Sequence, residues 1–107
     1  MVEEDPGVFE IEPGTMDPRK LVRAIDETIP QEVGILTGSG TSSGFPMMNL
    51  TRPRPFVHSA QFFGCIGQML PAAMGIIPAN GMKPLVLIDG DASTMMHLSD
   101  FDTAVRY

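Results

Sequence analysis

Apolar residues near the N-terminus recur at helical spacing. This run comprises Leu21, Val22, Ile25 and Ile29. Asp17 and Pro18 precede it as an N-cap and a first helical residue, where the N–H that proline lacks would have no helical partner. Pro30 ends the run, because the residue before a proline avoids helical backbone angles. The pattern predicts an amphipathic helix between Pro18 and Pro30.

Two short apolar runs, residues 33–37 and 85–89, are typical of buried strands in a parallel sheet. Residues 65–77 between them are apolar on every side, which predicts a helix that is buried all round. Residues 38–44 are expected to form a polar loop, and residues 45–56 an irregular segment because they contain three prolines. A last helix is indicated by Leu98, Phe101 and Val105.

Strands that alternate with helices predict an α/β fold, here a partial parallel sheet with flanking helices. Residues 1–16 are acidic, contain Pro and Gly, and are expected to be a linker with one short extended piece at residues 8–11. Ligands of parallel sheets bind beyond the carboxyl ends of the strands. Residues 38–44 and 90–93 both fall at such ends, so the sequence predicts a binding site there.

The composition narrows the class of protein. The chain has 107 residues, enough for one domain, and a net charge of -6, which argues against nucleic-acid binding because that requires a basic surface. Its single cysteine cannot form an internal disulfide. Residues 66–79, the longest mostly apolar stretch, are too few to span a bilayer, and the N-terminus does not resemble a signal peptide. A cytoplasmic protein without nucleic-acid or membrane partners is expected.

The turn formed by Gly90, Asp91, Ala92 and Ser93 suggests phosphate chemistry. Small residues let the backbone approach a ligand, and a hydroxyl and backbone N–H groups suit phosphate oxygens. Asp91 would repel a phosphate unless a cation lay between them, and Mg²⁺ takes one or two carboxylates together with phosphate oxygens. The turn therefore indicates a diphosphate bridged by Mg²⁺. The same four residues are also typical of an ordinary turn with a helix cap.

Three segments together resemble a known group of enzymes. Residues 64–75 (GCIGQMLPAAMG) are similar to a signature of the thiamine-diphosphate enzymes of the acetolactate synthase, benzoylformate decarboxylase and pyruvate decarboxylase group. Residues 88–93 (IDGDAS) resemble the start of that group's cofactor motif, and residues 100–106 (DFDTAVR) resemble the helix that follows it. The order and spacing also match. The resemblance implies that residues 17–107 are the N-terminal part of a thiamine-diphosphate-binding (pyrophosphate) domain, truncated before the paired asparagines that end the motif.

The resemblance also implies roles for individual residues. Asp91 matches the magnesium ligand, and Ile66 matches the apolar wedge that lies under the thiazolium and bends the cofactor. The Gly64 backbone matches a contact to the aminopyrimidine ring. Further cofactor contacts are implied for Gly90, Ala92 and Ser93, and for Thr41 and Ser42, which resemble a Thr-Ser pair of the benzoylformate decarboxylase branch. The family's activating glutamate belongs to a separate domain, so no catalytic residue is expected here.

Two kinds of function remain open. One is a part of an enzyme that makes or breaks a carbon–carbon bond next to the carbonyl of a 2-oxo acid, with thiamine diphosphate and Mg²⁺ as cofactors. Its substrate, and whether it is a synthase or a decarboxylase, stay undefined. The other is a non-catalytic binding or assembly module that pairs with another chain. A homo-oligomer or a complementing chain is expected in both cases, because a partial sheet has an unpaired edge.

A third hypothesis, a dinucleotide-binding site, is disfavoured. In a Gly-x-Gly-x-x-Gly turn that begins at Gly38, the third glycine would fall at Ser43. Pro46 and Pro53 are also expected to interrupt a helix that would have to follow the turn.

The remaining candidate residues have simpler expected roles. Cys65 is expected to be a small buried side chain without reactive character. His58 matches no position of the family, and His97 is expected to be exposed or to cap a helix. Arg52 and Arg54 flank Pro53 and are expected in a solvated loop rather than at a phosphate.

Overall fold

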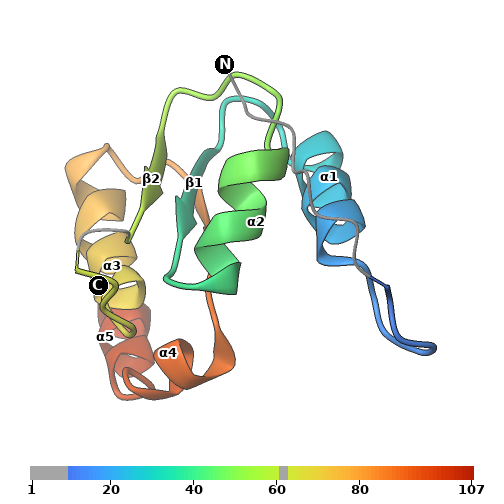
Figure 1. Ribbon diagram of the computed structural model, residues 1–107. Coiled ribbons are helices and arrows are strands. Elements are labelled where there is room, and N and C mark those ends of the chain that lie inside the picture. The colour runs from blue at the N-terminus through green and yellow to red at the C-terminus, as the bar shows by residue number, and fades with distance from the viewer. Residues whose placement is uncertain (1–9, 61–62) are drawn as a thin grey trace.

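The computed structural model describes residues 10–60 and 63–107 and shows a small parallel sheet flanked by helices, the predicted α/β fold (Figure 1). In chain order the elements are α1 (Pro18–Thr28), β1 (Gly34–Thr37), α2 (Thr41–Asn49), β2 (Val57–Ser59), α3 (Met69–Ala79), β3 (Leu85–Ile88), α4 (Asp91–Met95) and α5 (Asp100–Arg106). The extended piece expected at residues 8–11 begins outside the described residues, and Glu10 and Ile11 are not in a strand.

Helix α1 begins and ends as its sequence predicts. Asp17 is the N-cap, and its Oδ1 accepts a hydrogen bond from the backbone N–H of Arg19 at 2.9 Å. Ile29 leaves the helix with an extended backbone, directly before Pro30. The buried face contains Val22 and also Asp26, whose burial the apolar pattern did not predict.

The three strands are parallel and lie in the order β2-β1-β3. The chain therefore leaves β1 toward one edge of the sheet and crosses to the other edge before β3. Right-handed crossovers in opposite directions place their helices on opposite faces. Figure 1 shows this arrangement, with α1 and α2 on one side of the sheet and α3 on the other.

The core lies around the central strand β1. Ile35 and Leu36 have no exposed surface. Leu36 packs with Ala60 and with Met69 and Ala73 of α3, which form the buried cluster on that face. Side chains alternate along a strand, so Ile35 faces the opposite side, toward α2.

Helix α2 corrects the prediction of a polar loop at residues 38–44 and an irregular segment at residues 45–56. Its nine residues run through Pro46, which lacks an N–H and so removes one helical hydrogen bond. The Pro46 ring is fully buried, which compensates for that loss. The helix starts soon after Gly38, so the prediction that no helix follows this turn was wrong. The other argument against a dinucleotide site is unchanged, because Ser43 stands in place of the third glycine.

Helix α3 is shorter and more exposed than predicted. It begins at Met69 instead of near residue 65, because Gly64 and Gly67 before it have φ of +62° and +83°. Only Met69 and Ala73 are buried, since the helix covers one face of a narrow sheet. Cys65 lies before the helix and is exposed, so its prediction as a buried side chain was wrong.

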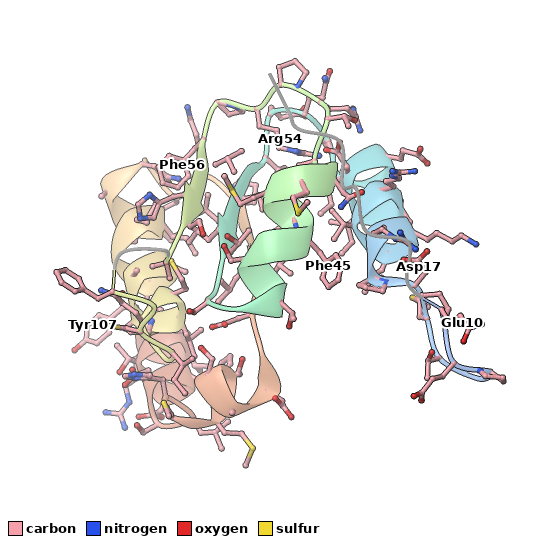
Figure 2. The ribbon with its side chains drawn as sticks, in the orientation of Figure 1. Glu10, Asp17, Phe45, Arg54, Phe56 and Tyr107 are labelled. Atoms are coloured by element: carbon pink, nitrogen blue, oxygen red, sulfur yellow. The ribbon has the colours of Figure 1, made fainter. Side chains whose placement is uncertain are left out.

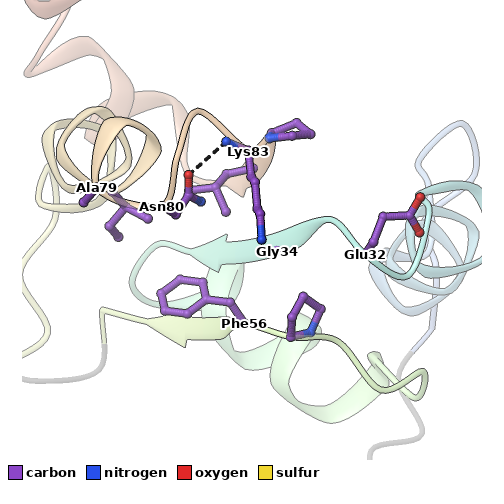
Figure 3. A pocket seen from close by; sticks show the side chains of 10 residues that line it. Glu32, Gly34, Phe56, Ala79, Asn80 and Lys83 are labelled. Atoms are coloured by element: carbon purple, nitrogen blue, oxygen red, sulfur yellow. Dashed lines mark hydrogen bonds between the residues drawn. The ribbon is translucent and has the colours of Figure 1, made fainter.

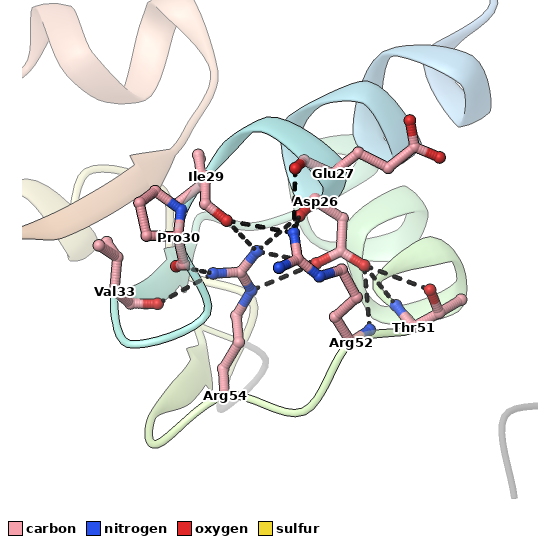
Figure 4. Close-up of polar contacts among 8 residues, drawn as sticks. All are labelled: Asp26, Glu27, Ile29, Pro30, Val33, Thr51, Arg52 and Arg54. Carbon is pink, nitrogen blue, oxygen red and sulfur yellow. Dashed lines mark hydrogen bonds and ion pairs between the residues drawn. The ribbon is translucent and has the colours of Figure 1, made fainter.

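The prediction that Arg52 and Arg54 lie in a solvated loop was also wrong. The Arg54 side chain, labelled in Figure 2, has no exposed surface. It pairs with Asp26 at 2.9 Å, and the Asp26 side chain is 2% exposed. Figure 4 shows both guanidinium groups over the last turn of α1. Arg54 also donates to the carbonyls of Pro30 and Val33 at 2.8 and 3.1 Å. The arginines thus neutralise Asp26 and the carbonyl end of α1.

The C-terminal elements carry a large apolar surface. Helix α5 is present as predicted, but none of its residues is buried. The exposed apolar residues in this part of the chain are Phe63, Ile66, Met82, Met95, Met96, Leu98, Phe101, Val105 and Tyr107. Tyr107 projects away from the body of the protein and is 94% exposed (Figure 2). Within the described ranges, no helix has the length and apolar character needed to cross a membrane.

Candidate functional site

The loops that follow β1 and β3 lie side by side at the carboxyl edge of the sheet. The backbone N–H of Gly38 donates to the carbonyl of Ile88 at 2.8 Å. A Cβ added at Gly38 would lie 1.9 Å from Asp89 Oδ1, so any larger residue would displace that carboxylate where the two loops touch. The two turns that the sequence singled out are therefore neighbours in space.

A cavity of about 440 Å³ opens at this edge, between the sheet and the helices α1 and α2. Among the predicted site residues, Thr41, Ser42 and Gly90 line it, and Asp89 is the charged side chain of its lining. In a parallel sheet, ligands usually bind in a crevice beside one particular strand. From that strand the chain connects to one neighbour on the left and to the other on the right. Strand β1 is such a strand, so the cavity is where the topology predicts a ligand.

The N-terminus of α2 offers donors for an anion. Gly40 is the N-cap residue, with φ +70° and no side-chain cap, and a Cβ there would meet nothing within 4 Å. Thr41 is exposed, while the Ser42 hydroxyl donates to the Ser39 carbonyl at 2.8 Å. The backbone N–H groups at a helix start carry partial positive charge and bind phosphate oxygens well.

The turn after β3 presents an accessible carboxylate. Asp91 is exposed, and its Oδ1 accepts a hydrogen bond from the Ala92 backbone N–H at 2.7 Å. Gly90 has open space around its Cα. In the described parts of the chain, no three His, Cys, Asp or Glu side chains are grouped to hold a metal ion. One carboxylate suits a Mg²⁺ ion that takes its other ligands from water and phosphate, not an all-protein cage.

Ser93 is held inside the site. It is 4% exposed, its hydroxyl donates to Asp89 Oδ2 at 2.6 Å, and its oxygen accepts from the Gly67 backbone N–H at 2.7 Å. Gly64 lies beside the first loop, because a Cβ there would be 3.9 Å from Ser39 Oγ. Ile66 is 52% exposed. The loop with the signature glycines thus joins the other two loops at the carboxyl edge.

Asp89 is the residue that sequence reasoning missed. It ends the apolar run of β3 and contacts Gly38, Gly90 and Ser93, but it was counted as part of the strand. A carboxylate at the carboxyl end of a buried strand is the signal that would have identified it.

Three further polar groups are the side chains of the two histidines and one buried hydroxyl. His97 is partly exposed, and its Nδ1 lies 2.8 Å from Asp100 Oδ2. His58 is exposed on β2 and stacks on Phe56, with 6.1 Å between the ring centroids. Thr37, the last residue of β1, has a buried Oγ1 without a hydrogen-bond partner among the described residues. A buried, unpaired hydroxyl is costly.

A second cavity, of about 320 Å³, lies at the opposite edge (Figure 3). Phe56, Ile76 and Leu85 form its apolar wall, and Figure 3 shows the Lys83 side chain extending across it toward Gly34. None of the predicted site residues lines this cavity. The carboxyl edge therefore remains the candidate site.

In an α/β sheet, carboxyl-edge loops that combine an uncapped helix start with an exposed carboxylate are typical of domains that bind a phosphate-bearing cofactor. Residues 37–107 match the family described as thiamine pyrophosphate enzyme, C-terminal TPP binding domain. The chain belongs to this family. The match extends from the end of β1 to the C-terminus and includes all three loops of the site, and it confirms the resemblance and the thiamine diphosphate cofactor.

Similar proteins have related descriptions. Probable acetolactate synthase 2, chloroplastic, of Oryza sativa subsp. japonica is 34% identical over 78% of this chain and 13% of its own length. Acetolactate synthase 2, chloroplastic, of Zea mays is 34% identical over 79% of this chain and 14% of its own. Sulfoacetaldehyde acetyltransferase of Castellaniella defragrans is 28% identical over 86% and 16%. The chain thus spans a small part of the length of these relatives.

Proposed function

We propose that this chain binds the diphosphate of thiamine diphosphate through Mg²⁺, as part of an enzyme that makes or breaks a carbon–carbon bond next to the carbonyl of a 2-oxo acid. The supporting observation is the contact of the β1 and β3 loops, which brings Thr41, Ser42 and Gly90 to one cavity, next to Asp91 in the chain. Acetolactate synthases among the relatives favour this reaction class.

The residues at the carboxyl edge fit such a cofactor. The backbone at Gly40 and Gly90 is open to a ligand, and Thr41 adds an exposed hydroxyl. Asp91 would hold the metal ion, which removes the repulsion between its carboxylate and the diphosphate. Ile66, which is half exposed beside the site, would support the thiazolium ring, and the Gly64 backbone would face the aminopyrimidine. Thiamine diphosphate supplies a thiazolium ylid that stabilises a carbanion.

The role of Asp91 is tested by titration calorimetry on the full chain. Thiamine diphosphate is expected to bind with Mg²⁺ present and at least tenfold more weakly after chelation, because the metal bridges two negative groups. Asp91→Ala should abolish this difference. Asp102→Ala is the matched control, since that carboxylate lies on the exposed face of α5 in an ion pair with Arg106. Equal binding with and without Mg²⁺ in the unmodified chain would refute the proposed metal site.

Association with a second chain or with a copy of itself is also proposed. The exposed apolar surface around α4 and α5 supports it, because large exposed apolar patches usually mark interaction surfaces. So does the outer edge of β3, which pairs with no strand among residues 10–60 and 63–107. A non-catalytic binding or assembly module would use the same surface. A cytoplasmic location stays a prediction, and the chloroplastic relatives from rice and maize do not support it.

A further inference from the structure

Both carboxylate oxygens of Asp89 are engaged within the loop after β3. Oδ1 accepts a hydrogen bond from the Gly90 backbone N–H at 2.8 Å. Oδ2 accepts one from the Ser93 hydroxyl at 2.6 Å. Hydrogen bonds to a charged acceptor are stronger than neutral ones, so this carboxylate fixes the orientation of the Ser93 hydroxyl.

Ser93 passes this constraint to the signature loop, defined here as residues 64–68. A serine hydroxyl has one proton, and that proton points to Asp89, so the oxygen faces other groups only as an acceptor. It accepts the backbone N–H of Gly67 at 2.7 Å. Gly67 is buried and directly follows Ile66. The position of Ile66 therefore depends on Ser93, and through it on Asp89.

The loop after β1 closes on the same carboxylate. A Cβ at Gly38 would lie 1.9 Å from Asp89 Oδ1 and 2.9 Å from Ser42 Oγ. The Gly38 N–H also donates to the Ile88 carbonyl at 2.8 Å. Three loops thus meet at the hydrogen-bonded pair of Asp89 and Ser93.

We propose that Asp89 is a positioning residue of the cofactor site, which orients Ser93 and thereby holds the signature loop in register with the turn at Gly90 and Asp91. The inference rests on the proposed function, because those loops carry the cofactor contacts. It also changes the role of Ser93. Its hydroxyl proton goes to Asp89 and not to a phosphate oxygen, so the Ser93 side chain places Gly67 and leaves only the Ser93 backbone to contact the diphosphate.

The first test measures amide hydrogen exchange by NMR in the full chain without cofactor. Asp89→Ala and Ser93→Ala should each raise the exchange rate of the Gly67 amide about tenfold, the effect of losing one strong hydrogen bond. The double variant should show no further increase, because both substitutions break the same chain of contacts. Asp102→Ala is the matched acidic control and should change nothing. An unchanged Gly67 rate in Asp89→Ala, or effects that multiply in the double variant, would overturn the proposal.

Gly38→Ala provides a second variant that keeps every polar group of the contact chain. Its Cβ displaces the Asp89 carboxylate, so the Gly67 amide should exchange faster while Ile35 and Leu36 in β1 keep their protection. If β1 and Gly67 lose protection together in every variant, Asp89 is a general stabilising residue and the proposal is wrong.

Calorimetric titration with Mg²⁺ and thiamine diphosphate then separates this inference from the proposed function. Asp89→Ala and Ser93→Ala should weaken binding by the same factor, and the double variant by no more. If the unmodified chain binds no cofactor, the proposed function fails and Asp89 has no cofactor-positioning role, whatever the Gly67 exchange shows. If it binds and Asp89→Ala binds equally well, the proposed function stands and the positioning role is refuted.

Discussion

Asp26 is a buried charge whose partners all lie on one segment. The Thr51 and Arg52 backbone N–H groups donate to its Oδ2 at 2.8 and 3.0 Å, and Arg54 binds its Oδ1. Burial by itself raises the pKa of Asp26, but these hydrogen bonds and the Arg54 charge outweigh it and hold the pKa below its usual value. The carboxylate is therefore charged in the folded protein, and it ties α1 to the chain between α2 and β2.

Removal of that charge should strongly destabilise the fold. Asp26→Ala leaves the Arg54 guanidinium buried and unpaired, a loss of roughly 3–5 kcal/mol in the free energy of unfolding. Urea denaturation followed by circular dichroism measures it. Asp102→Ala breaks an exposed ion pair instead and should change stability by less than about 1 kcal/mol. Similar losses in the two variants would show that the buried pair has no special weight.

The same lowered pKa predicts how stability depends on pH. A carboxylate whose pKa is lower in the folded state stabilises the protein above its unfolded pKa of about 3.9 and loses that contribution as pH falls through the folded value. Unfolding midpoints measured between neutral and acidic pH should therefore stay level and then fall at the acid end. Asp26→Asn should flatten that acid limb, and an acid limb of unchanged depth would contradict the assignment.

At the scale of elements, α3 contains a glycine at a position where no close contact requires one. Gly75 lies inside the helix, and a Cβ there would meet nothing within 4 Å. Gly75→Ala should therefore stabilise the chain by about 0.5–1 kcal/mol, because alanine restricts the unfolded chain more and favours helix. Gly81→Ala is the contrasting variant. Gly81 follows the helix with φ +78°, where a Cβ is strained, so this substitution should lower the stability of the chain. Thermal unfolding followed by circular dichroism at 222 nm gives the midpoint of each variant. Midpoint shifts of the same sign in both variants would refute this distinction.

The elements also show which sequence signals were informative. The strands β1 and β3 and the helix α1 were predictable, because their apolar spacing and caps are local. Helix α2 was not, because its buried positions are Ser43, Pro46 and Asn49, two of them polar and one a proline. Burial against α1 and β1 overrides the local preference there. For the same reason the ion pair of Asp26 with Arg54 could not be predicted, since it joins segments that come together only in the fold.

The candidate site was predicted as two turns, and the fold places them together. Parallel topology was sufficient to expect both turns at one edge. The hydrogen bonds inside the site were not predictable. The sequence indicated a phosphate contact for Ser93, whereas in the structure its hydroxyl donates to Asp89. The predicted roles of Thr41, Ser42 and Asp91 toward a cofactor stay predictions.

At the scale of the whole molecule, the apolar surface around α5 should govern behaviour in solution. Phe101 and Val105 are 45% and 86% exposed, and no residue of α5 is buried. The chain should therefore associate as its concentration rises, as measured by sedimentation velocity. Val105→Asp should reduce this association without loss of stability, whereas Arg23→Asp on exposed α1 should not reduce it. A chain that stays monomeric at all concentrations would contradict the prediction.

The strand order has a consequence for how the protein is made. The central strand β1 is synthesised before both of its neighbours, and nearly half of the chain lies between Gly34 and its partner Leu85. Ile35 and Leu36, fully enclosed in the finished fold, remain exposed until β3 has left the ribosome. Long sequence separation between paired strands slows folding. The nascent chain therefore presents its most deeply buried strand to chaperones until β3 has been synthesised.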